Sequence, residues 1–363
     1  MSEADFYSLK LLSVKRETES AVCLTFDVPA ELEEKFNFIQ GQYLTLRTIL
    51  EEKDIRRSYS ICAGVDDNKL QVAIKHIEGG AFSSFAFQLA AGDMLDVMPP
   101  QGNFHTPLSG ENKKRYLCIC AGSGITPMLS IIKSVLSKEP LSEVTLLYGN
   151  RNSASVMFKE DLSFVKNRYM NRFNWVNILS REEQDAEILF GRIDNRKGDE
   201  LARKGLISLR GVNEFFLCGP EPMISEVSRG LRANGVDESH IHYELFYASA
   251  EDAKEVVKKH HARAKQYGGQ MSEVVVTVAG RSSRFELTAD GENILDAAMT
   301  NGADLPFSCK GGVCATCKAR IMEGEVDMDL NHALTAQELA EGMILTCQAH
   351  PVSKKVVIDF DQL

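Results

Sequence analysis

Residues 308–319 read SCKGGVCATCKA, and this stretch decides the fold of the C-terminal part of the chain. It places three cysteines as Cys309-x4-Cys314-x2-Cys317, and a fourth, Cys347, follows after 29 further residues. The glycines and the alanine of the stretch keep bulky side chains away from the thiols and leave backbone N–H groups free to donate to sulfur. Four thiolates at this spacing indicate a metal centre.

The spacing is that of a plant-type [2Fe–2S] cluster. A structural zinc site usually shows two paired knuckles, whereas the fourth cysteine here stands alone. A thioredoxin-like disulfide needs one CxxC pair and leaves two of the four cysteines unexplained. We therefore predict a [2Fe–2S] cluster, with zinc or a redox disulfide as the alternatives. The predicted ligands are Cys309, Cys314, Cys317 and Cys347.

The residues around these cysteines, 273–363, carry the pattern of a small separate domain. The sequence predicts a β-hairpin at VVVTVAG and RFELTA, a helix at ENILDAAMTNG and a closing strand at VVIDF. This pattern resembles the β-grasp fold of plant-type ferredoxins. The domain carries 7 basic and 14 acidic side chains, so much of the chain's acidity is concentrated in it.

Residues 248–272 precede this domain and differ from it in composition. They are charged, poor in large apolar residues, and end in Gly268-Gly269. We expect an inter-domain linker, with a short helical part in its first half.

The whole chain has 363 residues, which predicts two or three domains at about 100–200 residues per domain. With 41 basic and 51 acidic residues, the formal net charge is −10, which argues against a nucleic-acid binder and offers no polybasic membrane patch. No apolar run reaches the roughly 18 residues of a membrane span. The cysteine count is odd, 9, and the N-terminus has no secretory signal, so we expect a reducing, cytoplasmic compartment.

The part of the chain before the linker falls into two patterns. In residues 1–110, close-spaced strands such as AVCLTFDV (21–28), which alternates like a half-buried strand, predict a small antiparallel β-barrel or sandwich. In residues 111–247, compact apolar runs alternate with plausible helices. This rhythm predicts a parallel sheet with helices on both faces, and a ligand site at the carboxyl ends of its strands.

Two motifs stand in the barrel, and the second points to a phosphorylated ligand. The first, RSYS (57–60), lies on a predicted strand and says little alone, since an Arg and a Tyr on a strand are usually surface and core residues. The second, GGAFS (79–83), is a turn that leads into a predicted helix. It places bare N–H groups and a hydroxyl at a helix N-terminus, an arrangement suited to a pyrophosphate.

The α/β part carries three further motifs, each at the end of a predicted strand. In GSGITP (122–127), a helix capped by Thr126 with Pro127 in its first turn is physically sound. Pro127 replaces the third glycine of the ordinary dinucleotide fingerprint. The other two motifs are CGPEPM (218–223) and ELF (244–246). A small buried residue that ends a strand is the alternative interpretation of the cysteine.

Together these motifs resemble the flavin and nicotinamide domains of the ferredoxin–NADP reductase superfamily. The order of barrel, α/β domain and ferredoxin is that of several oxygenase reductases, and the resemblance spans the whole chain. It implies a multidomain fold: an FAD-binding β-barrel at 1–110, an NADP(H)-binding α/β domain at 111–247, a linker at 248–272 and a β-grasp [2Fe–2S] ferredoxin domain at 273–363.

The resemblance also implies roles for particular residues. As catalytic residues it implies Ser60 near the flavin N5, Cys218 beside the hydride path and Glu244 near the nicotinamide. Arg57 would bind the flavin pyrophosphate, Tyr59 would pack on the isoalloxazine, and Phe246 would shield it, although in the plant enzymes the chain stops at that aromatic residue. The implied cofactor-binding residues are Arg57, Tyr59, Ser60, Lys75, Gly80, Phe82, Ser83, Gly122, Gly124, Thr126, Arg151, Ser180, Arg181, Gly219, Met223 and Phe246.

The nucleotide is predicted from the ends of the second and third strands of the α/β part. NAD enzymes often hold the ribose 2′-OH with an acidic residue after the second strand, where this chain has Asn150-Arg151. Ser180-Arg181 resembles the pair that holds the 2′-phosphate in plant-type reductases, and an Arg fork suits a phosphate dianion. We therefore expect NADPH. Solvated surface arginines are the alternative, and the flavin could be FMN, as in the phthalate dioxygenase reductases.

The expected activity is electron transfer from NADPH through FAD and [2Fe–2S] to a terminal oxygenase, with an aromatic acyl-CoA as the oxygenase's substrate. A flavin between a two-electron hydride and a one-electron cluster explains why these domains share a chain. The acidic ferredoxin domain suggests a basic docking patch on the oxygenase. The alternatives are a reductase of another oxygenase that uses NADH, and a non-catalytic electron carrier. A complete oxygenase is disfavoured, because the histidines show no Rieske or facial-triad spacing.

Overall fold

The computed structural model describes residues 6–246 and 250–363. Contacts divide the chain into two compact units, one formed by Tyr7–Ile55 and Tyr59–Glu244 and the other mainly by Leu245–Leu363. The predicted boundary between residues 247 and 248 lies outside the described residues. The finer boundaries at 110 and 272 remain predictions.

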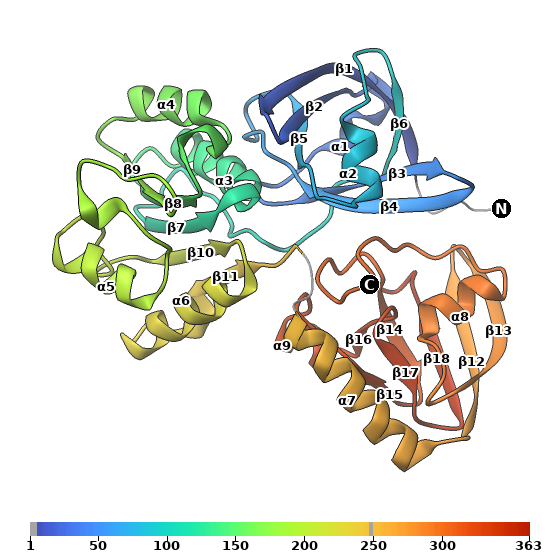
Figure 1. Ribbon diagram of the computed structural model, residues 1–363. Helices are drawn as coiled ribbons and strands as arrows, with labels where there is room; N and C mark the ends of the chain where they lie inside the picture. The colour runs from blue at the N-terminus through green and yellow to red at the C-terminus, as the bar shows by residue number, and fades with distance from the viewer. Residues whose placement is uncertain (1–5, 247–249) are drawn as a thin grey trace. The chain divides into compact units, whose positions relative to one another are not determined.

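The first half of the larger unit is an antiparallel sheet of six strands in the order β4-β3-β6-β1-β2-β5 (Figure 1). A bridge between Ile61, just after β4, and Val72 on β5 joins the two edges of the sheet, as the predicted barrel requires. Its elements are β1 (Tyr7–Thr18), β2 (Ala21–Asp27), α1 (Glu33–Phe36), β3 (Tyr43–Leu50), β4 (Lys53–Ser60), β5 (Leu70–Lys75), α2 (Ala81–Ala86) and β6 (Met94–Val97).

Strand β2 departs from its predicted pattern. Residues 21–26 are buried on both faces of the strand, and not on alternate positions as expected for a half-buried strand. Thr25 explains part of the difference, because its Oγ1 accepts hydrogen bonds from Ser13 Oγ at 3.1 Å and Gln71 Nε2 at 2.8 Å. The neighbouring strands β1 and β5 thus cover the polar face with bonded side chains.

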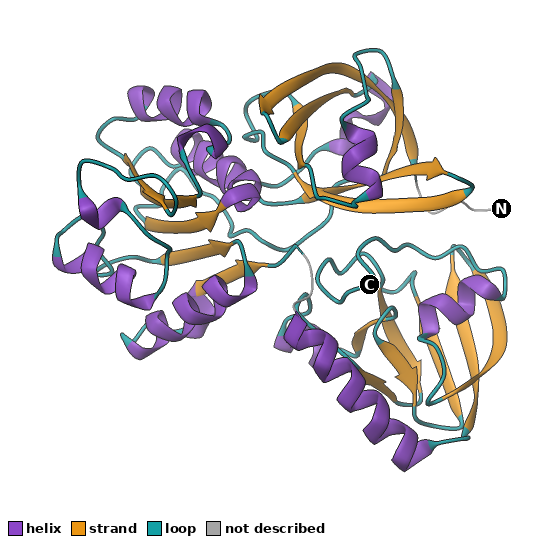
Figure 2. Ribbon diagram, viewed as in Figure 1, coloured by secondary structure: helices purple, strands orange, loops and turns teal. Residues whose placement is uncertain are grey.

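The second half of the larger unit is a five-stranded sheet in the order β11-β10-β7-β8-β9, and every pair in it is parallel. Figure 2 shows α3 and α4 on one side of the sheet and α5 and α6 on the other, as predicted. The elements are β7 (Arg115–Ala121), α3 (Ile125–Lys138), β8 (Glu143–Asn150), α4 (Lys159–Arg168), β9 (Phe173–Leu179), α5 (Asn195–Arg203), β10 (Glu214–Cys218), α6 (Glu221–Ala233) and β11 (Ile241–Glu244).

The smaller unit has a mixed five-stranded sheet in the order β13-β12-β18-β14-β16 and a separate ribbon of β15 and β17. The strand β12 pairs with β13 antiparallel and with β18 parallel, which matches the predicted hairpin and closing strand. The elements are β12 (Met271–Val278), β13 (Arg281–Thr288), α8 (Ile294–Thr300), β14 (Lys318–Glu323), β15 (Val326–Met328), α9 (Ala336–Ala340), β16 (Met343–Leu345), β17 (Ala349–Pro351) and β18 (Lys355–Asp359).

The segment predicted as a linker forms α7 (Ala250–Tyr267), an 18-residue helix of the smaller unit. It is longer than the short helical part expected from the sequence, and it packs on the unit through Arg263, whose side chain is 1 % exposed. His260 and His261 are exposed on it. Among the described residues, no helix is long and apolar enough to cross a membrane.

Candidate functional site

The cysteine loop of the smaller unit turns its backbone N–H groups toward sulfur. The chain adopts left-handed conformations at Lys310 (φ 52°) and Gly312 (φ 73°). As a result, the N–H of Gly311 donates to Cys309 Sγ at 3.4 Å, and the N–H of Cys309 donates to Cys314 Sγ at 3.5 Å. Such bonds stabilise negative charge on the sulfurs, as thiolate ligands need.

The four cysteines form two pairs, Cys309 with Cys314 and Cys317 with Cys347, and the thiols of each pair are hydrogen-bonded. The bond from Cys314 and three backbone N–H groups lower the pKa of Cys309 to about 6, against the effect of burial. Among the described residues, no three His, Cys, Asp or Glu side chains form one group that could hold a single metal ion. Two thiol pairs suit the two irons of a [2Fe–2S] cluster.

The strand β4 carries the residues that the resemblance assigns to the flavin. Arg57 is exposed, and its Nη1 donates to the carbonyl of Arg56 at 2.7 Å. The ring of Tyr59 lies 5.6 Å from the ring of Phe82, centroid to centroid. Phe82 is itself buried in the barrel core.

The turn at residues 79–83 is held by its own serine. Ser83 Oγ accepts from the N–H of Ile77 at 3.1 Å and contacts the carbonyl of Gly80 at 3.0 Å. A Cβ on Gly80 would lie 2.6 Å from Ser83 Oγ, so the turn has no room for a side chain there. The hydroxyl that the sequence offered to a pyrophosphate is therefore engaged with the turn's backbone.

The three predicted catalytic residues meet where the barrel adjoins the parallel sheet. Ser60 Oγ donates to Glu244 Oε2 at 3.1 Å, although 184 positions separate the two residues. Glu244 ends β11 and is in register with Cys218, which ends β10. The structure thus brings Ser60, Cys218 and Glu244 to one place at the carboxyl edge of the sheet.

Burial dominates the chemistry of this group. It raises the pKa of Glu244 to about 8, although the bond from Ser60 acts in the opposite direction. Burial, followed by the charge of Glu244, also raises the pKa of Cys218 well above its usual range. At neutral pH the site therefore holds a protonated carboxyl beside an un-ionised thiol.

Glycines let the backbone close tightly around this group. Gly122 has φ 57°, and a Cβ on Gly124 would lie only 2.2 Å from the carbonyl oxygen of Cys218. A Cβ on Gly219 would lie 2.7 Å from Cε of Met223, which is buried on α6. The turn that follows β7 therefore packs directly against the backbone at the end of β10.

Thr126 does not cap the helix that follows. The N-terminal cap of α3 is Gly124, and no side chain bonds to the helix there. Thr126 lies inside the first turn, where it is buried and donates to the carbonyl of Ser123 at 3.0 Å. The prediction that Thr126 caps the helix was wrong because the short 3-10 turn at 122–124 moves the start of α3 to Ile125, one residue before Thr126.

Comparison with known proteins identifies the family of this chain. The chain matches the oxidoreductase FAD-binding domain over residues 8–106, the oxidoreductase NAD-binding domain over 118–229 and the 2Fe-2S iron-sulfur cluster binding domain over 276–352. It is 44% identical to one of the subunits of the 1,2-phenylacetyl-CoA epoxidase of Escherichia coli K12, over 98% of each chain. The chain belongs to the family of oxygenase reductases.

A second relative agrees with this placement, and a solved structure shares the fold. The ferredoxin reductase component of the 3-ketosteroid-9-alpha-monooxygenase of Mycolicibacterium smegmatis is 32% identical, with 98% of this chain and 97% of the relative covered. Phthalate dioxygenase reductase, a solved structure, matches with a TM-score of 0.58 at 21% identity, over 98% of each chain. This oxygenase reductase therefore uses FAD, a [2Fe–2S] cluster and a nicotinamide nucleotide.

The residues predicted for the nucleotide lie at the carboxyl edge of the sheet in this oxygenase reductase. Arg151 and Arg181 are exposed, and the N–H of Arg181 donates to the carbonyl of Arg151 at 2.8 Å. Ser180 Oγ contacts the carbonyl of Asn150 at 3.3 Å. Burial and the charge of Arg151 lower the pKa of Lys75 on β5. Three cationic side chains thus stand at this edge.

Phe246 follows β11 and is partly buried. Its neighbours 247–249 lie outside the described residues, and its predicted role at the flavin remains a prediction.

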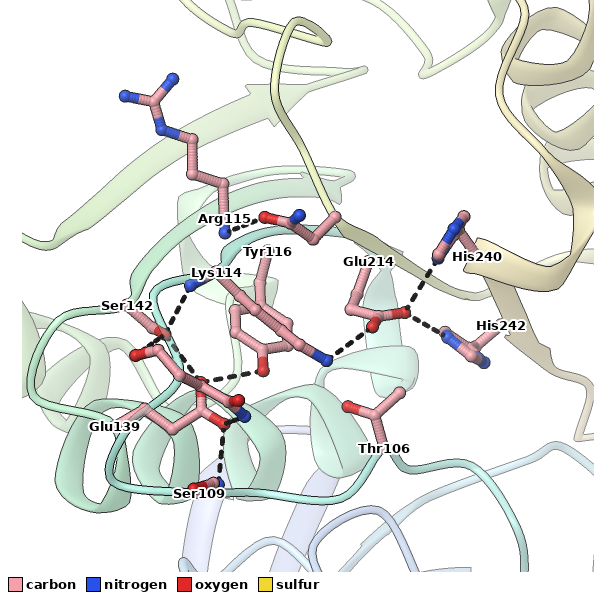
Figure 3. Close-up of polar contacts among 12 residues, drawn as sticks. Thr106, Ser109, Lys114, Arg115, Tyr116, Glu139, Ser142, Glu214, His240 and His242 are labelled. Carbon is pink, nitrogen blue, oxygen red and sulfur yellow. Dashed lines mark hydrogen bonds and ion pairs between the residues drawn. The ribbon is translucent and has the colours of Figure 1, made fainter.

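Sequence reasoning missed a polar network at the opposite, amino edge of the sheet (Figure 3). Glu214, which begins β10, contacts Lys114 Nζ at 2.9 Å and His242 Nε2 at 2.9 Å. Nearby, the buried Glu139 accepts from Tyr116 at 2.9 Å and from Ser142 at 2.7 Å. No motif marks these residues, because each is a single polar side chain at the start or end of a strand or helix.

The network changes the ionisation of its members in opposite directions. Burial by itself would raise the pKa of Glu214, but the bonds from His242 and Lys114 outweigh it and bring the pKa to about 2. Burial and the bond to Glu139 raise the pKa of Tyr116. Every group here has a bonded partner, which is typical of a structural network.

Proposed function

We propose that this oxygenase reductase passes electrons from NADPH through FAD and the [2Fe–2S] cluster to the terminal oxygenase of a phenylacetyl-CoA epoxidase, in phenylacetate degradation. The observation that carries the proposal is the bond between Ser60 on the flavin side and Glu244 on the nicotinamide side. It joins the two halves of the larger unit at the point where a hydride would cross. The alternative is the NADH-dependent reductase of another oxygenase.

The bound groups would supply the redox chemistry: the nicotinamide gives a hydride, the flavin divides its electron pair, and the cluster carries single electrons. The chain's own residues would bind these groups and orient them. Ser60 Oγ donates to Glu244 Oε2 at 3.1 Å, so the hydroxyl is fixed beside a carboxyl whose pKa of about 8 keeps a proton available at neutral pH. Cys218, buried and un-ionised, excludes water from the same place.

The choice of NADPH rests on charge. Arg151 and Arg181 are exposed and adjacent at the carboxyl edge, and Lys75 adds a third cation nearby. A 2′-phosphate dianion suits this arrangement better than a ribose hydroxyl, which an acidic side chain would hold.

The choice of oxygenase rests on the 44% identity to the epoxidase component over nearly the whole of both chains. The acidic C-terminal domain, with 14 acidic and 7 basic side chains, supports a basic docking patch on the partner. The odd number of cysteines, 9, supports the cytoplasmic location that we include in the proposal.

The deciding experiment is an anaerobic titration of the purified full chain with NADPH and, in parallel, with NADH, followed by visible absorbance. We expect NADPH to bleach both the flavin and the iron–sulfur bands. A strong preference for NADH would overturn the nucleotide assignment. Absence of bleaching with either nucleotide would leave the electron-carrier alternative.

A cysteine variant tests the order of the carriers. We expect Cys309→Ser to lose the iron–sulfur bands while NADPH still reduces ferricyanide, because flavin reduction precedes cluster reduction in the proposed order. Cys23→Ala, which removes a thiol from the barrel, is the matched control and should keep both. Loss of ferricyanide reduction in Cys309→Ser alone would show that the order is wrong.

The proposed electrostatic docking to the partner can be tested by varying the salt concentration. Electrostatic docking weakens as the Debye length falls from about 14 Å at 50 mM to about 4 Å at 500 mM salt. We therefore expect reduction of the phenylacetyl-CoA oxygenase component to slow over this range. A rate that does not respond to salt would contradict the proposed basic patch.

A further inference from the structure

The helix α7 is fastened to the smaller unit by a buried arginine. Arg263 Nε donates to the carbonyl of Ala289 at 2.9 Å, and its Nη1 contacts Asp327 at 2.7 Å and Asp329 at 2.8 Å. One turn earlier, Lys259 Nζ donates to the carbonyl of Met328 at 2.9 Å. The helix therefore holds β15 and the residue that follows it (Figure 1).

Asp329 connects this helix to the strand that follows Cys347. Its side chain is 9 % exposed and contacts both Arg263 and His350 Nε2, the latter at 3.1 Å. Its backbone N–H donates to the carbonyl of Gln348 at 2.9 Å. Burial would raise the pKa of Asp329, but the bonds from His350 and Arg263 lower it, so the carboxylate stays charged.

Gln348 completes the path to the cysteine loop. Its Nε2 donates to the carbonyl of Lys310 at 3.0 Å and lies 3.8 Å from Cys347 Sγ. A Cβ on Gly312 would lie 3.2 Å from both the Gln348 side chain and the carbonyl of Leu330. The segment that Arg263 holds therefore packs directly against the loop that carries the cysteines.

We propose that Arg263 is a positioning residue of the electron-transfer site: by binding Asp327 and Asp329 it holds the β15–β17 ribbon against the cysteine loop and sets the reduction potential of the cluster. The inference rests on the proposed ligand role of Cys347. It makes α7 a part of the cluster site, and not a linker that merely precedes it.

The direction of the effect follows from charge. Reduction adds one negative charge to the cluster, and its potential depends on the net charge and hydrogen bonds around it. Without the guanidinium, Asp327 would lose its cationic partner and Asp329 would keep only the bond from His350, so negative charge beside the Gln348–Cys347 segment would be less compensated. The reduced form would then be destabilised, and the potential would become more negative.

The test is a redox titration of the full chain with dithionite and mediator dyes, followed by cluster absorbance and by the electron paramagnetic resonance signal of the reduced cluster. This titration needs no NADPH, so it can fail independently of the proposed function. We expect Arg263→Met to shift the potential to more negative values, with a several-fold change in the equilibrium constant for one-electron reduction. Arg263→Lys and the double variant Arg263→Met/Asp327→Asn should recover part of the shift.

The matched control is Lys265→Met, which removes the same charge from an exposed position two residues along the helix. It should leave the potential unchanged. An Arg263→Met protein with an intact cluster and the wild-type potential would overturn the proposal, and so would an equal shift in Lys265→Met. Loss of the cluster from both Arg263→Met and Arg263→Lys would also overturn it, because the helix would then only stabilise the fold.

Discussion

Two glutamates mark opposite ends of the parallel sheet, and their surroundings differ in kind. Glu214 begins β10, is bonded to Lys114 and His242, and has a pKa lowered to about 2 by these partners against the effect of burial. Glu244 ends β11, is bonded to the hydroxyl of Ser60, and has a pKa raised to about 8 by burial. The first carboxylate is met by the Lys114 ammonium and an imidazole, and the second by a neutral hydroxyl.

The difference indicates that the two ends of the sheet have different roles. A carboxylate paired with cations lowers the free energy of the folded state, whereas a buried carboxyl beside a neutral partner costs stability and keeps its proton. Perturbed groups of the second kind gather where chemistry takes place. The amino edge therefore stabilises the fold, and the carboxyl edge is the candidate active site.

The largest effect is expected from adding a side chain to Gly124 at the carboxyl edge. In Gly124→Ala the new Cβ would lie 2.2 Å from the carbonyl oxygen of Cys218, so the turn that follows β7 must move away from the end of β10. A displacement of about 1 Å at a reacting centre can cost about a hundredfold in rate. We expect a loss of that size in kcat/KM for NADPH–ferricyanide activity, measured by steady-state kinetics, with the iron–sulfur spectrum unchanged.

The control is Gly198→Ala in α5, where a Cβ would meet nothing within 4 Å. It should keep wild-type kinetics. Wild-type activity in Gly124→Ala would show that the close approach of Gly124 to Cys218 does not matter for hydride transfer.

The next largest effect concerns the amino edge. The pKa of Glu214 is lowered from 4.5 to about 2, so its contribution to stability is present above about pH 4.5 and is lost as the pH falls through about 2. After allowance for solvent screening, the contribution is about 2 kcal/mol. We expect Glu214→Gln to lower the free energy of unfolding by this amount at pH 7, and the difference from the wild type to shrink toward pH 2.

The chain offers a local probe for this measurement. Trp175 is its single tryptophan and lies on β9 of the same sheet, so urea unfolding followed by tryptophan fluorescence reports on this part of the molecule. Glu143→Gln, at an exposed salt bridge at the start of β8, serves as the control and should change stability little. A pH-independent loss in Glu214→Gln would mean that the side chain acts by packing and not by charge.

The sequence predicted residues of the carboxyl edge but none of the polar network at the amino edge, and the reason is physical. Ligand-binding residues occur in short motifs, because a turn must offer several groups to one ligand; GSGITP and CGPEPM are of this kind. The pairing of Lys114 with Glu214 joins single residues 100 positions apart and leaves no pattern in the chain. The bond between Ser60 and Glu244, 184 positions apart, leaves no pattern either, and only the family resemblance assigned both residues to the site.

The helix α7 shows a second limit of prediction from the sequence. Its charged composition predicted an inter-domain linker with a short helical part, and the sequence does not show that Arg263 is buried. The burial depends on Asp327 and Asp329, which lie 64 and 66 positions later in the chain. The fold class, by contrast, followed from strand periodicity and cysteine spacing, because both are local.

A smaller effect is expected from the hydroxyl that meets Glu244. Ser60→Ala removes the donor to Glu244 Oε2, and the loss of one hydrogen bond to a partly buried carboxyl costs about 1–1.5 kcal/mol. We expect the rate of flavin reduction by NADPH, measured by stopped-flow absorbance, to fall about tenfold. Ser8→Ala, at an exposed position on β1, should leave this rate unchanged. A wild-type rate in Ser60→Ala would separate the hydroxyl from the hydride step.

The smallest effect is expected from Glu244→Gln, which gives the most direct comparison of the two glutamates. The folded chain holds a proton on Glu244 up to about pH 8, whereas the unfolded chain loses it near pH 4.5, so this group lowers stability progressively as the pH rises between these values. Because Gln cannot ionise, Glu244→Gln should be the more stable protein above about pH 8, by an amount on the order of 1 kcal/mol after solvent screening.

The same tryptophan-monitored urea unfolding, with FAD saturating, measures this difference against pH, since bound cofactor would otherwise shift the apparent stability. Glu214→Gln and Glu244→Gln make the same chemical change at the two ends of one sheet, and we expect them to move stability in opposite directions at pH 8. Destabilisation by both would show that Glu244 has a compensating partner at the carboxyl edge, and the contrast between the two ends would fail. A gain in stability together with slower flavin reduction in Glu244→Gln would show that the fold keeps this carboxyl at a cost because the reaction uses it.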